Sequence, residues 1–165
     1  MQPGYLLPAA LAATLAFNAP AGAATIERTE IMMAVSACQS ALPVFDGVIR
    51  KRPLAVQNEG SAGAFITCGL EGVFYAAPHN SYVGIGLLNN GSATVTVNCT
   101  LVDGGSGFSN PEYLPASKTI AAGNKVEMEW YPEGDGFLYP AISCSLPPGT
   151  GITYVSRMFN EEIGS

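Results

Sequence analysis

Apolar and polar side chains alternate along several short segments of this chain. In "KVEMEWY", Val126, Met128 and Trp130 share one face of an extended strand, while Glu127 and Glu129 share the other face. A period of two residues is typical of a strand with one buried side and one side in water. The pattern therefore predicts a half-buried strand with an acidic outer face, and it places Trp130 in the core row.

A related string of residues occurs three times. Residues 58–70 read "NEGSAGAFITCGL", residues 89–101 read "NNGSATVTVNCTL", and a looser copy, "DGFLYPAISCSL", covers residues 135–146. Each copy has turn-forming residues and then a strand in which a cysteine is flanked by apolar residues two positions away. The repeat therefore predicts a turn followed by a strand whose cysteine faces the core.

The turn residues predict that each repeat forms the turn and the second strand of a β-hairpin. Asn-Gly is the strongest short hairpin signal, because both residues adopt positive φ at low cost. A three-residue loop over 89–91 would place Ile85 opposite Val95 and Val83 opposite Val97, whereas a two-residue loop would place apolar residues beside threonines. We therefore expect the three-residue loop, with Gly91 in the left-handed conformation.

The remaining segments predict further short strands. "PLAVQ" and "GITYVSRMF" read as strands, while "IERTEIMMAVSACQSA" fits either a strand or a short helix over residues 25–37, with a strand ending near Cys38 preferred. Nineteen Gly and 12 Pro supply turns between them. About eight short strands at this spacing predict an antiparallel β-sandwich, immunoglobulin-like or jelly-roll-like, with a closed barrel as the alternative.

The first residues predict export. From Tyr5 to Phe17 the chain is apolar and uncharged, and the small residues Ala21 and Ala23 fit a signal peptidase site, although no Lys or Arg precedes Tyr5. We expect residues 1–23 to be a signal peptide and residues 24–165 to form a single secreted domain, extracellular or periplasmic. No later run is long enough to predict a membrane span.

Four cysteines in an exported chain predict two disulfides. Pairing Cys38 with Cys68 and Cys99 with Cys144 is preferred, and pairing Cys68 with Cys99 stays open because sequence does not determine connectivity. A metal centre is not predicted, because the chain has no C-x-x-C motif and a single histidine.

The succession N-x-G-S…C-x-L, N-G-S…V-x-C-x-L and C-x-L-P-P resembles a loosely defined group of small secreted bacterial all-β proteins. The resemblance implies export and a disulfide-bonded sandwich. It implies no activity, and it assigns no functional residue.

Catalytic chemistry has weak support in the sequence. His79 is the sole imidazole, and no G-x-S-x-G nucleophile motif accompanies it. Solvent exposure alone explains Glu127 and Glu129, and the glycine-rich segment 103–112 lacks the spacing of a calcium loop. The net charge of −6 argues against nucleic acid as a partner. We therefore predict no catalytic residue and no cofactor.

The aromatic cluster in "EWYPEGDGFLY" is the most informative candidate site. Tyrosine and tryptophan combine an apolar face, suited to stacking on a sugar ring, with a polar handle. Trp130, Tyr131 and Tyr139 are therefore candidate ligand-binding residues, with Tyr131 the more exposed ring because Trp130 continues the inward row.

Three classes of function follow. The first is a secreted, non-catalytic structural or binding module that assembles through strand edges, with "EIMMAV" as an added strand and the protein itself or another protein as partner. The second is a carbohydrate-binding module that uses the aromatics of the 129–139 hairpin to bind a polysaccharide. The third is an enzyme or an inhibitor, for which "SLPPGTG" would be the exposed loop.

Overall fold

The computed structural model describes residues 24–72, 79–104, 110–134 and 136–163. The predicted signal peptide and the centre of the glycine-rich segment lie outside these residues. Among the residues described, no helix is long and apolar enough to cross a membrane.

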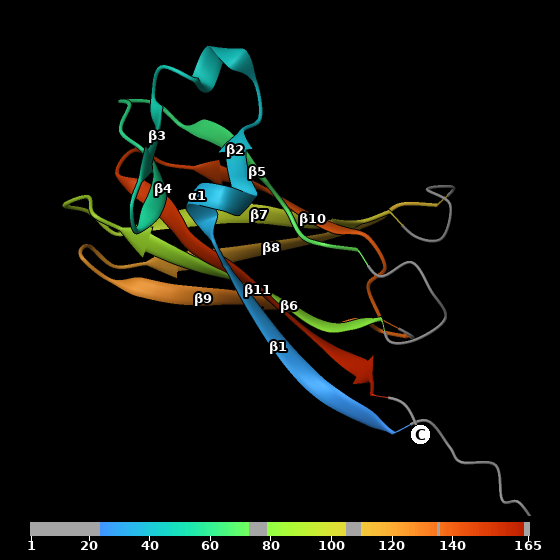
Figure 1. Cartoon of the computed structure of the whole chain (residues 1–165). Helices are drawn as coiled ribbons and strands as arrows, with labels where there is room; N and C mark the ends of the chain where they lie inside the picture. The colour runs from blue at the N-terminus through green and yellow to red at the C-terminus, as the bar shows by residue number, and fades with distance from the viewer. Residues whose placement is uncertain (1–23, 73–78, 105–109, 135, 164–165) are drawn as a thin grey trace, which may run out of the picture.

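The chain forms two antiparallel sheets packed face to face, with the order of the elements shown in Figure 1. The first sheet, called sheet A, has the order β3-β4-β11-β6-β9, and β1 pairs with β11 beside β4. Its strands are β1 (Thr25–Met33), β3 (Ile49–Arg52), β4 (Ala55–Asn58), β6 (Asn80–Asn89), β9 (Lys125–Trp130) and β11 (Thr150–Glu162).

The second sheet, called sheet B, has the order β2-β5-β10-β7-β8. Its strands are β2 (Cys38–Ser40), β5 (Ala64–Gly69), β7 (Val95–Asp103), β8 (Glu112–Ile120) and β10 (Pro140–Leu146). The predicted antiparallel sandwich is confirmed, with a finer division into strands than expected, and the alternative of a closed barrel is not what the chain forms.

The core lies between the sheets and includes the inward rows that alternation predicted in β5, β7, β9 and β10. Sheet B contributes apolar residues and half-cystines, and sheet A contributes branched aliphatic residues and two larger side chains. The fully or almost fully buried members include Ile66, Val97, Leu101, Ile142 and Leu146 from sheet B, and Val83, Ile85, Leu87, Met128, Trp130, Ile152 and Val155 from sheet A. The central strands of both sheets therefore have one face in the core, as a two-layer sandwich requires, whereas β1 contains no buried residue.

The N-terminal segment combines both of the structures that its sequence allowed. It is a strand as far as Met33, then a short helix, α1 (Ala34–Ala37), and a second strand that begins at Cys38. The prediction of one strand ending near Cys38 is therefore wrong. β1 pairs with β11 at every position from Thr25 to Met33. The apolar run proposed for self-assembly is thus paired within its own chain, and the self-assembly hypothesis loses the observation on which it was based.

The predicted hairpin between Ile85 and Val95 does not form. β6 belongs to sheet A, where it pairs with β11 and β9, whereas β7 belongs to sheet B, where it pairs with β10 and β8. The connection around Gly91 is an arch that crosses from one sheet to the other. Gly91 is not among the described glycines with positive φ, which are Gly123, Gly136 and Gly149.

The repeated string encodes this arch twice. In the first copy the buried Asn58 side chain donates to the carbonyls of Ala62 and Leu146, each at 2.8 Å, and accepts from the Gly60 N–H at 2.9 Å. The side-chain amide therefore satisfies backbone groups that the ladder leaves unpaired where the chain changes sheet.

The second copy makes the same three bonds. The buried Asn89 donates to the carbonyls of Ala93 and Ile120 at 2.8 and 3.0 Å, and accepts from the Gly91 N–H at 2.9 Å. In the third copy the chain also crosses from sheet A to sheet B, but here Asn80 of β6 donates to the carbonyl of Phe137 at 3.0 Å. The similarity of the three strings is thus a similarity of sheet crossings.

Both disulfides lie in sheet B. Cys38 is bonded to Cys68, and Cys99 is bonded to Cys144. Each pair sits directly opposite on neighbouring strands, β2 with β5 and β10 with β7. The preferred pairing is confirmed.

Candidate functional site

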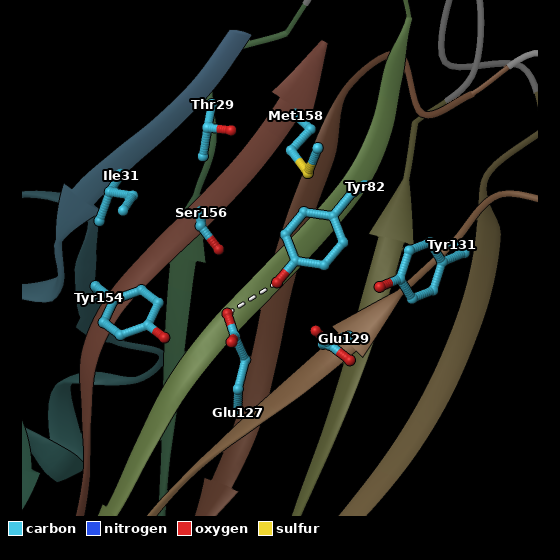
Figure 2. A pocket seen from close by; sticks show the side chains of 9 residues that line it. All are labelled: Thr29, Ile31, Tyr82, Glu127, Glu129, Tyr131, Tyr154, Ser156 and Met158. Carbon is cyan, nitrogen blue, oxygen red and sulfur yellow. Dashed lines mark hydrogen bonds between the residues drawn. The ribbon is translucent and has the colours of Figure 1, made fainter. Parts of the chain in front are cut away.

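The outer face of sheet A carries a groove. Its larger hollow has a volume of about 350 Å³ and crosses β1, β11, β6 and β9. Figure 2 shows the side chains that line it: Thr29 and Ile31 from β1, Tyr82 from β6, Glu127 and Glu129 from β9, Tyr131 just after β9, and Tyr154, Ser156 and Met158 from β11. The groove therefore brings together residues from both ends and the middle of the chain.

Two glycines in β6 make room for the groove. A methyl group at Gly84 would overlap the Tyr82 hydroxyl and would lie 2.7 Å from Ser156 Oγ. A methyl group at Gly86 would overlap the Tyr154 ring and the Thr153 hydroxyl. Glycine inside a strand marks a place where other groups approach closely, and here those groups are the tyrosines.

A bulge in β11 determines which of its residues line the groove. The register of β11 with β6 shifts between Ile152 and Tyr154. Ile152 and Val155 therefore both face the core, while Tyr154 and Ser156 face the groove. An extra residue in one strand reverses the alternation beyond it, and bulges commonly redirect side chains next to functional sites.

The tyrosines at the centre of the groove are coupled to a carboxylate. Tyr82 donates its hydroxyl hydrogen to Glu127 Oε1 at 2.8 Å, drawn as a dashed line in Figure 2. Burial, followed by this hydrogen bond, raises the pKa of Tyr82 above its ordinary value. Burial and then the charge of Glu127 also raise the pKa of Tyr154. Both phenols are therefore neutral hydrogen-bonding groups at neutral pH.

Ser156 is a buried hydroxyl inside this groove. Its residue is 4% exposed, and among the described residues its Oγ has no hydrogen-bond partner. A contact with Ser156 opposes the rise in the pKa of Tyr82, yet no hydrogen bond of ordinary geometry joins the two hydroxyls. A buried polar atom without a partner costs about 1 to 3 kcal/mol, so Ser156 is an unsatisfied hydroxyl in the wall of the groove.

Aromatic rings line one side of the groove. The Tyr131 ring is 63% exposed, and its centroid lies 5.4 Å from that of Tyr82 at an interplanar angle of 60°. A second hollow of about 340 Å³ continues the groove along β9 and shares Glu127 and Tyr154 with the first, with Lys125 at its far side. Because they share these two lining residues, the two hollows form one continuous track on the outer face of sheet A.

The structure separates the three aromatic residues that the sequence proposed as ligand contacts. Tyr131 lines the groove. Trp130 is 5% exposed and donates its ring N–H to the Leu114 carbonyl at 2.9 Å, so it is a core residue that joins the two sheets and does not line the groove. Tyr139 is half-buried just before β10, near Gly72, and does not line the groove.

Sequence reasoning missed Tyr82, Tyr154 and Ser156. The two glycines of "YVGIGLL" lie on the same face as Tyr82, and a strand face that carries glycine beside tyrosine is a signal for a hollow. Ser156 offers no such signal, because strict alternation from Ile152 would place it in the core. The acidic row of Glu127 and Glu129 was expected on the outer face, and both carboxylates line the groove.

No protein-family model matches this sequence, and no curated protein matches it. Solved structures with a similar arrangement of strands include carbohydrate-binding modules. The C-terminal CBM6 of LamC, a marine laminarinase from Zobellia galactanivorans, is 10% identical, covers 80% of this chain and 99% of its own, and has a TM-score of 0.45. The family 29 module CBM29_1 from Piromyces equi is 10% identical, with 81% and 91% covered and a TM-score of 0.44.

A third similar structure is the module CBM6cm-2 from lichenase 5A of Cellvibrio mixtus, in complex with cellotriose. It is 8% identical, the alignment covers 79% of this chain and 95% of that chain, and the TM-score is 0.43.

Proposed function

We propose that this protein is a secreted, non-catalytic carbohydrate-binding module whose ligand lies in the groove on sheet A. The observation that carries the proposal is the joint lining of the groove by tyrosine rings, carboxylates and hydroxyls. The apolar faces of Tyr82 and Tyr131 suit the C–H faces of sugar rings. Glu127, Glu129 and Ser156 accept hydrogen bonds from sugar hydroxyls.

The shape of the groove also supports a polymer as ligand. The two hollows lie end to end across the open face of a sheet and share Glu127 and Tyr154. A track of this kind holds successive units of a chain, whereas a small molecule needs a deeper pocket to bury most of its surface. We therefore place a polysaccharide or oligosaccharide along β9 and across β6 and β11.

Export is part of the proposal. Two disulfides with no free cysteine among the described residues suit an oxidising compartment, such as the periplasm or the extracellular space. A polysaccharide ligand would be met in the same place. The predicted signal peptide in residues 1–23 would deliver the chain there.

The test is polysaccharide binding by the oxidised protein and two matched variants. We expect Tyr131→Ala to weaken binding at least tenfold, which is about 1.4 kcal/mol. Tyr113→Ala is the control, because Tyr113 is 64% exposed, almost the same as Tyr131, but lies on β8 of the other sheet. Affinity electrophoresis against a panel of soluble polysaccharides measures both.

Two results would overturn the proposal. One is the absence of binding to every polysaccharide by folded, oxidised protein. The other is equal loss of binding in Tyr131→Ala and Tyr113→Ala, which would place the ligand away from the groove.

A further inference from the structure

The groove carries negative charge that the protein does not neutralise. Glu127 and Glu129 both line it, and among the described residues neither forms an ion pair, whereas Glu30, Glu59, Glu71 and Glu161 all pair with arginine. The one basic side chain that lines either hollow is Lys125, at the far side of the second. Two carboxylates side by side favour a cation between them.

Ser156 independently indicates a missing polar partner. Its hydroxyl is buried, has no hydrogen-bond partner among the described residues, and faces the same hollow as the carboxylates, as Figure 2 shows. A serine oxygen accepts a hydrogen bond from an N–H group as readily as from an O–H group. A ligand donor placed between β11 and β9 would therefore satisfy Ser156 and the carboxylates together.

The aromatic rings of the groove also favour a cation. The face of a tyrosine ring attracts a cation within about 6 Å of its centroid. Tyr82 and Tyr131 lie 5.4 Å apart and flank the side of the hollow where Glu129 lies, as seen in Figure 2. An ammonium group there would meet ring faces and carboxylates at once, whereas a uronic acid would meet like charge.

We propose that the groove selects sugars that carry a free amine, so that its ligand is a glucosamine-type oligosaccharide and neither an N-acetylated nor an acidic one. This inference rests on the proposed carbohydrate-binding function and narrows it to a chemical class. The sugar ammonium donates to Glu127, Glu129 and Ser156 Oγ, and the ring faces of the sugar stack on the tyrosines.

The experiment compares short oligosaccharides of equal length by calorimetry on the oxidised protein. The probes are a glucosamine oligomer, the same oligomer fully N-acetylated, a β-1,4-glucose oligomer and a galacturonic acid oligomer. We expect the free-amine oligomer to bind at least tenfold more tightly than the N-acetylated one, and this preference to shrink as salt is added, because the interaction is partly electrostatic.

Two isosteric variants separate the groove from the net charge of the protein. Glu129→Gln should bring the ratio of the affinities for the free-amine and N-acetylated oligomers most of the way to one, whatever its effect on the affinity for neutral oligomers. Glu112→Gln changes the net charge equally but lies on β8 of sheet B, so it should keep the preference. Equal loss in both variants would show adsorption of a cation to an acidic protein and would overturn the inference.

The failure of this inference differs from the failure of the proposed function. If neutral and N-acetylated oligomers bind as tightly as the free amine, the amine selectivity is wrong while carbohydrate binding stands. If none of the four oligomers and no polysaccharide binds, both proposals fall.

Discussion

The groove over sheet A exists because two positions of its central strand have no side chain. Gly84 and Gly86 lie beneath the hydroxyl of Tyr82 and the ring of Tyr154, so the phenols rest close to the backbone of β6. Glycine weakens a strand because of its conformational freedom, and here its missing side chain leaves space for the two phenols. The shape of the groove thus depends on the absence of side chains at these two positions.

We expect Gly84→Ala to reduce polysaccharide binding about tenfold or more, because the new methyl group would push the Tyr82 hydroxyl away from Glu127 and crowd Ser156. The free energy of unfolding should fall by about 1 to 3 kcal/mol, as is usual for overpacking. Calorimetric titration and chemical denaturation measure the two effects.

Gly69→Ala is the control for this substitution. Gly69 also lies in a strand, β5, but no atom lies within 4 Å of where its methyl group would be. Its binding should equal that of the unchanged protein. If Gly84→Ala binds as well as Gly69→Ala, the floor of the groove does not shape the binding site.

Four connections carry the chain from sheet A to sheet B: one runs from β1 through α1 to β2, and each of the other three is encoded by a copy of the repeated string. β4 leads to β5, β6 to β7, and β9 to β10. In the first two, one buried asparagine satisfies three backbone groups at the crossing. The repeat therefore encodes a corner of the sandwich. There the hydrogen bonding between strands ends, and the asparagine side chain bonds the backbone groups that are left without a strand partner.

We expect Asn89→Ala to lower the free energy of unfolding by about 3 kcal/mol, because it leaves two carbonyls and one N–H near the core without their partner. Equilibrium denaturation in urea provides the measurement. The neighbouring Asn90 is exposed, with a single side-chain bond to Gln57 at 3.0 Å. Asn90→Ala should therefore cost less than about 0.5 kcal/mol, and equal losses at both positions would contradict the structural role of Asn89.

The sequence could predict the strands on either side of each corner but not the corner itself. A hairpin and an arch both need Asn and Gly at a tight change of direction, and in both cases the strand that follows has its cysteine facing the core. The register with Ile85 opposite Val95 looked favourable because it paired apolar residues locally. The actual partners are distant in the chain, since Ile85 lies opposite Val155 and Met128.

In the whole molecule, different interactions link the strands within each of the two sheets. Both disulfides join neighbouring strands of sheet B. In sheet A, the buried Arg157 of β11 forms an ion pair with Glu30 of β1 at 2.5 Å and so joins the last strand of the chain to the first. Arg157 also pairs with Glu71 at 3.2 Å, and its guanidinium carbon lies 4.7 Å from the ring centroid of Phe159. The proposed binding face thus belongs to sheet A, which has no disulfide.

We expect removal of either disulfide to lower the free energy of unfolding by about 4 kcal/mol on the chain-entropy model, since the cysteines are 30 and 45 residues apart. Cys38→Ala with Cys68→Ala, and Cys99→Ala with Cys144→Ala, provide the two double variants, measured by denaturation at neutral pH.

The groove offers a further readout for these variants. Because sheet A has no disulfide, a variant that remains folded should bind polysaccharide as the unchanged protein does. A folded variant that loses binding would show that sheet B sets the geometry of the groove.

The sequence by itself determined the strand segments, the inward cysteines, the acidic outer row of β9 and hence the sandwich class. These follow from a period of two residues, which is a local property of an extended chain. It also identified Tyr131 as the more exposed aromatic residue. Only the tertiary structure decided which strands pair, where the chain changes sheet, and that a bulge after Ile152 turns Tyr154 and Ser156 outward. Those features depend on contacts between distant segments, and a shift of one residue in register exchanges the core face of a strand for its outer face.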